Sequence, residues 1–417
     1  MEEIVTKEPQ KRKMKLSNYA MLTTHGINLI VNVFVSTFLV SYIYSISNNY
    51  IINIGLFYCF NYLCMGVSYY IISMFLDKTN RVTFYRIAIV IRTIFIMCVV
   101  FLGRKLAELV ILAGLLHGFS EACYWSSYNI MKNELVPNSC MGSYASLQIV
   151  IDKVVNIVIP IILGKIIDAD SFKTSAIIVL CVAVIEMVFS FLIKSKRPEN
   201  SSFNMREFIS DIKQLGEKKS LVTDIIIYGG VYGVITMIAP LNTILIMLSF
   251  NSNFSLGLIT SLFSAASMVF LFIIKRFTKT GKRTLLYILV SVFSMLSVLM
   301  VVIFTNKIIL VIYMLIYNIC TVSHAYNYDV HRNRVLKRFS MYDDIAEFQC
   351  CIECMMEVAR AFTFLVMIIV GVIVGISGMA VATKVLLVVS MTMLPIFNIG
   401  LLFYERRLKK FNLIEEN

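Results

Sequence analysis

Twelve long apolar stretches constrain the fold of this chain more than any other feature. Each holds roughly 20 or more residues, and a helix rising ~1.5 Å per residue then crosses a hydrocarbon layer ~30 Å thick. Every backbone polar group in lipid must be satisfied within its own segment, so helices are expected. The stretches run over 17–43, 51–76, 83–103, 107–131, 143–167, 174–194, 221–248, 255–275, 284–304, 308–330, 345–374 and 379–403.

The composition agrees with this assignment. Hydrophobic residues make up 59% of the chain and charged residues only 15%, whereas a soluble domain exposes far more charge. The polar segments between the stretches are short and leave no room for a large soluble domain. We therefore predict an all-α membrane protein with twelve transmembrane helices.

The sequence nearly repeats itself at an offset of about 201 residues. The repeat predicts a six-helix bundle over 1–194, a cytoplasmic linker over 195–220 and a second six-helix bundle over 221–417. Two parallel halves in a membrane protein are typical of a transporter that rocks about a site between them. The matching residues are Lys78-Thr79 with Lys279-Thr280, Leu109-Val110-Ile111 with Leu310-Val311-Ile312, Gln148 with Gln349, and Asp152 with Glu353.

The net charge of +13 follows from membrane topology rather than from nucleic-acid binding. Of the 38 Lys and Arg residues, 29 fall in the termini and alternate loops on one side, and 4 fall in the loops on the other side. The positive-inside rule then places both termini in the cytoplasm. We predict a multi-pass protein of the inner or plasma membrane, surrounded by lipid and acting as a monomer.

No motif for a cofactor or a metal stands out. The ten Cys lie in or beside the apolar stretches, and Cys350, Cys351 and Cys354 have no second Cys or His pair to complete a ligand set. There is no glycine-rich phosphate-binding loop. An ion or substrate gradient is therefore the expected energy source, and neither a cofactor nor enzymatic activity is predicted.

The loop after the second stretch reads Asp77-Lys78-Thr79-Asn80-Arg81, and the loop after the eighth reads Lys279-Thr280-Gly281-Lys282-Arg283. Both resemble the loops after spans 2 and 8 of the major facilitator superfamily, although Ser73, Asn80 and Val82 depart from its pattern. The resemblance implies a twelve-helix 6+6 fold in which Asp77, Lys78 and Arg81 latch the cytoplasmic side. An ordinary positively charged loop is the alternative.

A second segment, 118–125 followed by Asn129 and Glu134, resembles the fourth span of a branch of this superfamily found in low-GC Gram-positive bacteria. That branch is poorly characterised. It implies no particular substrate, so the polar residues inside the spans must indicate the site.

The first span carries a polar stripe. His25, Asn28, Asn32 and Ser36 recur at helical spacing and share one face. The resemblance implies that the first span lines a substrate cavity, which makes the stripe a candidate binding wall. Hydrogen bonds that hold helices together are the alternative.

The fourth span carries a carboxylate beside an imidazole. His117 and Glu121 are one turn apart, and Tyr124, Trp125 and Tyr128 continue the face. Trp125 is the only tryptophan of the chain. We expect His117 and Glu121 to form a proton-binding pair in low dielectric, with a static structural pair as the alternative.

The repeat brings further acids toward the centre. Asp152 in span 5 corresponds to Glu353 in span 11, where Glu357 and Arg360 share the same face. The resemblance implies that spans 5 and 11 meet the opposite half, so these acids and His324 of span 10 are candidate proton or substrate ligands. It also places spans 3, 6 and 12 outside the centre, with Arg86, Arg92, Glu186 and Lys384.

These features predict a secondary transporter that works by alternating access. We expect proton-coupled export of a small organic compound, cationic or amphipathic, because acids and aromatic rings suit a cation. One alternative is a flippase for a lipid or lipid-linked precursor. The other is a transporter-like sensor or a membrane-embedded enzyme.

Overall fold

The computed structural model describes residues 14–76, 78–194, 203–279, 283–304, 306–339 and 344–411. Within these ranges the chain forms helices and turns but no strand. Each of the twelve predicted stretches coincides with one helix or with a run of joined helices, which confirms the predicted fold class. Among the described residues, ten helices are long and apolar enough to cross a membrane.

The first seven helices and the π-helical segment η1 account for the first six spans, with α1, η1 and α2 forming one continuous span. Their bounds are α1 (Leu16–Val33), η1 (Phe34–Leu39), α2 (Val40–Ile46), α3 (Tyr50–Leu76), α4 (Arg81–Leu102), α5 (Val110–Leu135), α6 (Met141–Ala169) and α7 (Phe172–Ser190).

A short helix, α8 (Met205–Gln214), lies within the linker and precedes the last six spans. The seventh span consists of α9 and α10. The bounds are α9 (Lys219–Ile235), α10 (Ile238–Phe250), α11 (Asn253–Lys279), α12 (Arg283–Ile303), α13 (Lys307–Arg338), α14 (Ile345–Val374) and α15 (Met379–Lys410).

Polar side chains fix several helix starts. The Asn80 side chain accepts a hydrogen bond from the Val82 amide at the start of α4. Ser171 accepts one from the Thr174 amide at the start of α7. Such caps satisfy amides that have no partner within the helix, so the polar residues between apolar stretches set where the spans begin.

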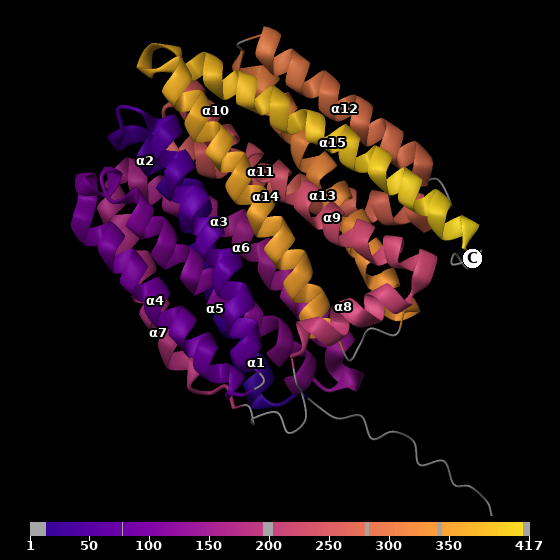
Figure 1. The fold of residues 1–417 in the computed structure, drawn as a ribbon. Coiled ribbons are helices and arrows are strands. Elements are labelled where there is room, and N and C mark those ends of the chain that lie inside the picture. Colours follow the sequence, from indigo (N-terminus) through magenta and orange to yellow (C-terminus); the bar gives the residue numbers. More distant parts are fainter. Residues whose placement is uncertain are drawn as a thin grey trace, which may run out of the picture.

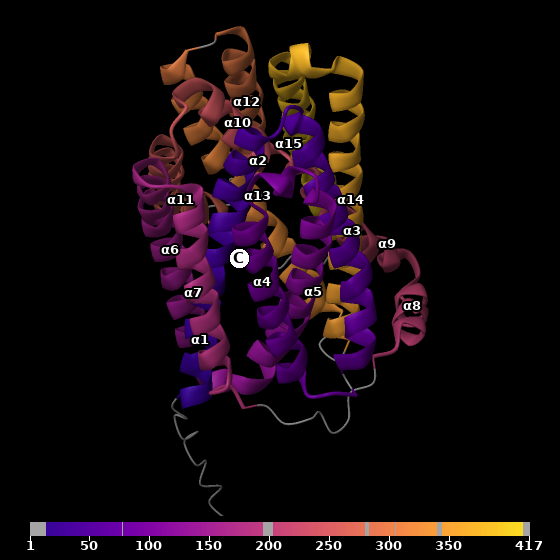
Figure 2. The ribbon, with the colours of Figure 1, turned by 90° about the vertical axis from the view of Figure 1, so that its left-hand side faces the viewer.

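Helices α1–α7 gather on one side of the molecule and α9–α15 on the other (Figure 1). The main contacts between the two groups join α3 to α14 and α6 to α11. The groups converge toward α2 and α10, which lie near each other in both views (Figures 1 and 2), and they diverge toward the start of α1 and the C-terminus (Figure 1). We call the diverging end the terminal end and the converging end the opposite end.

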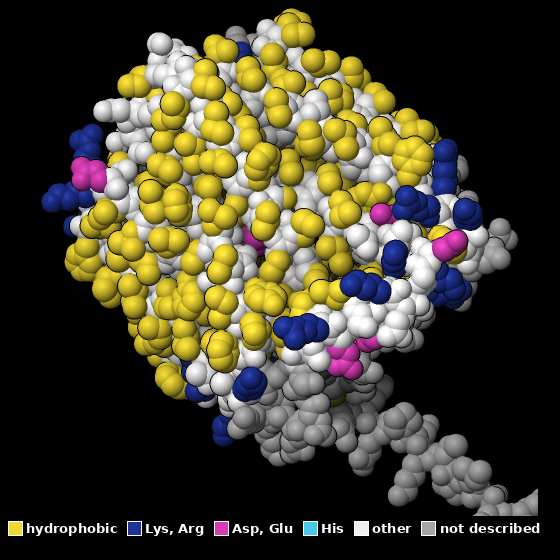
Figure 3. Space-filling model, in the orientation of Figure 1, with side chains coloured by type: hydrophobic (Ala, Val, Ile, Leu, Met, Phe, Trp, Pro, Cys, Tyr) yellow, Lys and Arg dark blue, Asp and Glu magenta, His cyan; other side chains and the backbone are white. Residues whose placement is uncertain are grey.

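Polarity is distributed as a lipid environment demands. Large apolar side chains point outward, for example Phe101 and Ile373, which are 79% and 78% exposed. Hydrophobic side chains cover most of the face in Figure 3, and charged side chains gather at its edges. Charged groups lie inside instead, with Arg92, Glu186 and Glu357 fully buried. Charges inside a membrane protein face the interior and pair there, because exposure to lipid is costly.

Two glycines let α6 and α11 approach closely. A Cβ added at Gly257 would overlap the Pro160 carbonyl oxygen, and one added at Gly164 would overlap the Asn253 carbonyl oxygen. Only glycine permits backbones to come this near. The α6–α11 contact is therefore tight near the opposite end of the molecule.

Candidate functional site

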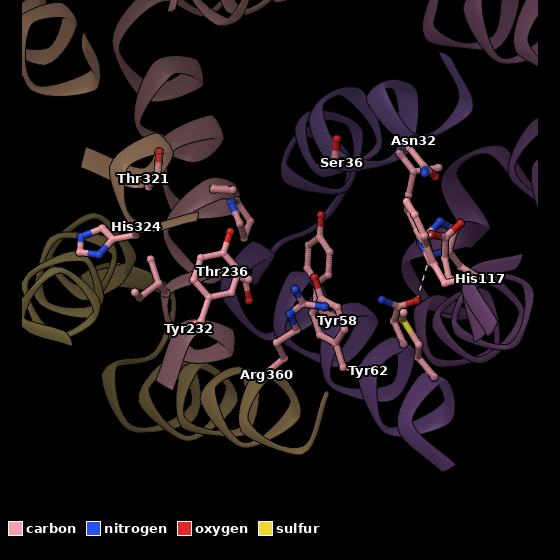
Figure 4. Close-up of a pocket in the computed structure, with 18 of the residues that line it drawn as sticks. Asn32, Ser36, Tyr58, Tyr62, His117, Tyr232, Thr236, Thr321, His324 and Arg360 are labelled. Carbon is pink, nitrogen blue, oxygen red and sulfur yellow. Dashed lines mark hydrogen bonds between the residues drawn. The ribbon is translucent and has the colours of Figure 1, made fainter. Parts of the chain in front are cut away.

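A cavity of about 380 Å³ lies between the two helix groups. We call it the central cavity. In Figure 4, Asn32, Ser36 and His117 lie on one side of it, and Thr321 and His324 lie on the other. Helices of both groups supply its lining, which comprises Asn32, Val35, Ser36, Tyr58, Asn61, Tyr62, Met65, His117, Glu121, Trp125, Tyr232, Ile235, Thr236, Ala239, Pro240, Tyr317, Thr321, His324 and Arg360.

Glu121 is the only carboxylate in this lining among the described residues. Its Oε2 atom accepts a hydrogen bond of 2.9 Å from the indole N–H of Trp125. Its Oε1 atom lies 3.6 Å from a guanidinium nitrogen of Arg92. Arg92 in turn donates to both oxygens of Glu186 at 3.1 Å. Two buried carboxylates thus share one guanidinium.

This cluster differs from the sequence interpretation in two respects. Arg92 and Glu186 were expected outside the central region, yet Arg92 contacts a carboxylate of the cavity wall. His117, expected to pair with Glu121, instead has Nδ1 2.9 Å from Asn61 Oδ1. Arg92 is a cation of span 3 and Glu186 is the acid of span 6, and their opposite charges were the available signal.

Arg360 is the other formally charged residue of the lining. It donates a 2.5 Å hydrogen bond to Glu357, as the predicted stripe allows. Its guanidinium carbon lies 5.2 Å from the Tyr62 ring centroid, so the side chain bridges toward the other helix group. Figure 4 shows Arg360 reaching toward Tyr58 and Tyr62. Glu357 lies behind it, fully buried.

A second cavity of about 530 Å³ lies toward the terminal end, and we call it the vestibule. Glu353 lines it and accepts a 2.6 Å hydrogen bond from Gln349. The acids predicted to share one face therefore separate, with Glu353 in the vestibule and Glu357 behind Arg360. The lining is Tyr69, Ser73, Trp125, Asn129, Ile130, Lys132, Gln148, Asp329, Arg332, Asn333, Leu336, Ile345, Ala346, Gln349 and Glu353.

The polar stripe of the first span divides as well. Asn32 and Ser36 line the central cavity, whereas His25 and Asn28 do not. His25 is buried between three helices, with Nδ1 2.8 Å from the Tyr124 hydroxyl and Nε2 3.0 Å from Asp152. These contacts join α1, α5 and α6 within one group.

The aromatic residues of the fourth span also separate. Tyr124 and Tyr128 are buried and stack on each other with ring centroids 5.4 Å apart. The Tyr128 ring also stacks on His25 at 4.8 Å. Trp125 lines both cavities instead. His324 lines the central cavity, and neither ring nitrogen has a hydrogen-bond partner among the described residues.

Of the candidate latch residues, Lys78 and Arg81 lie at the terminal end. Asp77 lies outside the described residues. Lys78 is exposed. Arg81 forms an ion pair with Glu134 at the end of α5, within the same helix group.

At the opposite end, one carboxylate accepts several hydrogen bonds between the two helix groups. Asp168, near the end of α6, accepts hydrogen bonds from the Ser252 hydroxyl at 2.7 Å and the Phe254 amide at 2.9 Å. It also accepts from the backbone and side-chain nitrogens of Asn253 at 3.0 and 3.1 Å. Asn253 Oδ1 accepts a 2.6 Å bond from Ser41. The two groups are thus joined at the start of α11.

Comparison with known proteins agrees with this architecture. The family model of the Major Facilitator Superfamily matches residues 21–328. A search of curated protein sequences finds no match.

Two solved structures illustrate the likeness of the fold. A variant of the nucleoside transporter NupG is 12% identical, with a TM-score of 0.70, and covers 94% of this chain and 100% of its own. A POT family transporter in complex with a thioalcohol-conjugated peptide is 10% identical, with a TM-score of 0.68, and covers 94% and 96%. At such identity the likeness concerns the fold alone.

Proposed function

Because the chain belongs to the Major Facilitator Superfamily, we propose that it is a proton-coupled secondary transporter that exports a small, positively charged organic compound. The observation that carries the proposal is the Glu121 carboxylate, which faces the central cavity and shares Arg92 with Glu186. A protein of this kind needs one group that binds a proton in one step and the cargo in another.

The charge balance of the cluster supports Glu121 in that role. Arg92 donates to both oxygens of Glu186, whereas its nearest nitrogen is 3.6 Å from Glu121. One guanidinium beside two carboxylates leaves an excess negative charge in a desolvated place. A proton or a bound cation removes that cost, and Glu121 is the acid of the cluster that either can reach from the cavity.

Competition for one carboxylate accounts for the proposed direction. A proton and a cationic cargo cannot both neutralise Glu121, so each releases the other. With the proton gradient directed inward, such exchange drives the cargo outward. The rings of Tyr58, Tyr62 and Tyr232 line the same cavity and favour a cation through their π faces.

The two ends of the molecule supply a basis for alternating access. The opposite end is joined through Asp168, while the vestibule leads toward the terminal end. The distribution of Lys and Arg supports a cytoplasmic terminal end in the cell membrane, with both termini inside. We propose a monomer, since the cavity is built from one chain.

Reconstitution into vesicles tests this function. With an imposed pH gradient, organic cations should accumulate against their gradient. Glu121→Gln should abolish the dependence on pH and weaken cation binding, because the carboxylate that the cation neutralises is lost. The matched control is Glu108→Gln, at an exposed acid between α4 and α5. Cation flux that does not depend on the pH gradient contradicts the proposal. A Glu121→Gln variant whose cation flux still depends on the pH gradient contradicts it as well.

A further inference from the structure

Trp125 borders both cavities. Among the described residues, it is the only one in the lining of both the central cavity and the vestibule. We propose that Trp125 is an inner gate, which closes the central cavity toward the vestibule and which the Glu121 carboxylate holds in place. This inference rests on the proposed function and adds a regulator to its site.

One hydrogen bond and several edge-on contacts with neighbouring aromatic rings hold the indole of Trp125. Its N–H donates to Glu121 one turn earlier in α5, at 2.9 Å. The Tyr124 and Tyr128 rings meet it nearly perpendicularly at centroid distances of 5.2 and 6.1 Å. The His25 ring lies 6.3 Å away at 77°. Edge contacts of this kind position a ring without filling every side of it, so the hydrogen bond fixes the orientation.

Several charged and titratable groups surround this bond. Arg92 of α4 faces Glu121, with Glu186 of α7 behind it. The His25 ring of α1 faces the indole, and its Nε2 atom contacts the Asp152 carboxylate on the side away from the indole. Arg360 of α14 lies across the cavity, Tyr62 of α3 lines the cavity on the side of α5, and His117 lies on α5 itself. Of these groups, only Glu121 accepts a hydrogen bond from the indole N–H.

Ionisation of Glu121 therefore controls the gate. Bonds to a charged acceptor are roughly twice as strong as neutral ones. The ionised carboxylate holds the indole between the cavities, and a proton or a cationic cargo on Glu121 weakens that hold. Binding at Glu121 thus opens the route to the vestibule, and release closes it.

Thiol labelling measures passage through the gate. In a cysteine-free background, Thr236→Cys places a thiol in the central cavity and Asn129→Cys places one in the vestibule. A membrane-impermeant thiol reagent is applied to the terminal end. We expect Cys introduced at 129 to react faster than Cys introduced at 236. The ratio of the two rates removes the effect of pH on thiol reactivity.

Three variants test whether Trp125 and its hydrogen bond to Glu121 limit labelling at position 236. Trp125→Ala should speed labelling at 236 about tenfold relative to 129, since a bond to a charged group is lost together with the ring. Glu121→Leu should approach the same ratio, because leucine cannot accept the bond. Trp125→Phe should give an intermediate ratio. In the wild type, lowering the pH should raise the ratio, and Glu121→Leu should remove that dependence.

The sole tryptophan supplies an independent readout. Emission of the purified wild type reports on Trp125 alone. The emission should change with pH, and its quenching by iodide should increase when the pH is lowered, whereas Glu121→Leu should show neither response. The gate proposal is wrong if the wild type is labelled equally fast at 236 and 129. It is also wrong if Trp125→Ala has the same ratio of labelling rates as the wild type, even where proton-coupled flux is intact. Absence of coupled flux overturns the proposed function, whatever the labelling ratio.

Discussion

Replacing Asp168 with alanine should open the end of the molecule opposite the termini. The carboxylate receives four hydrogen bonds from Ser252, Asn253 and Phe254 across the boundary between the helix groups. It caps the start of α11 as an N-cap side chain would, and loss of such a cap costs about 0.5–2 kcal/mol. Asp168 is exposed, so water competes for its hydrogen bonds. The cost of losing all four bonds therefore stays close to that of losing one cap. We expect 1–2 kcal/mol, equivalent to about a 5- to 30-fold shift toward the open state.

The assay is labelling of Ser36→Cys from the side opposite the termini, in a cysteine-free background. Ser36 lines the central cavity, so a reagent reaches it from that side only when α6 and α11 separate. Asp170→Ala is the matched control, since Asp170 is an exposed acid at the same helix end with no hydrogen bond to α11 in the described structure. Unchanged labelling in Asp168→Ala, or an equal rise in Asp170→Ala, would refute the reasoning.

Three further predictions follow from buried groups and close packing. Arg92→Ala should lower the free energy of unfolding by about 3–5 kcal/mol in thermal denaturation, because it leaves buried Glu186 without its partner; neutralising both residues with Gln should recover part of the loss. Gly257→Ala should cost about 1–3 kcal/mol and favour the state open opposite the termini, since the methyl group meets the Pro160 carbonyl, whereas Gly142→Ala, with open space around it, should not. Glu353→Gln should reduce coupled flux less than Glu121→Gln, because Glu353 lines the vestibule rather than the central cavity.

The spans were predictable because hydropathy alone defines them. The ends of the longest helices were not. The stretch predicted over 308–330 belongs to α13, which continues to Arg338. Its last residues are polar and helical, so they carry no apolar signal.

The site was predictable only in part. Spacing along one helix placed Glu357 and Arg360 on the same face, where the two side chains form an ion pair. It could not show that Arg92 and Glu186, on separate helices, would meet behind Glu121. Nor could it separate His25 from Asn32, because the packing of α1 against α5 and α6 decides which part of the stripe meets the cavity.

The exchange of a proton for the cargo at Glu121 is the central claim, and proton release on binding tests it most directly. A cation identified by thermal shift is added to the purified protein in weak buffer, at a series of pH values. We predict that binding to the wild type releases a proton and that binding to Glu121→Gln releases none. Cation binding without proton release in the wild type, or with equal release in the variant, would contradict the account.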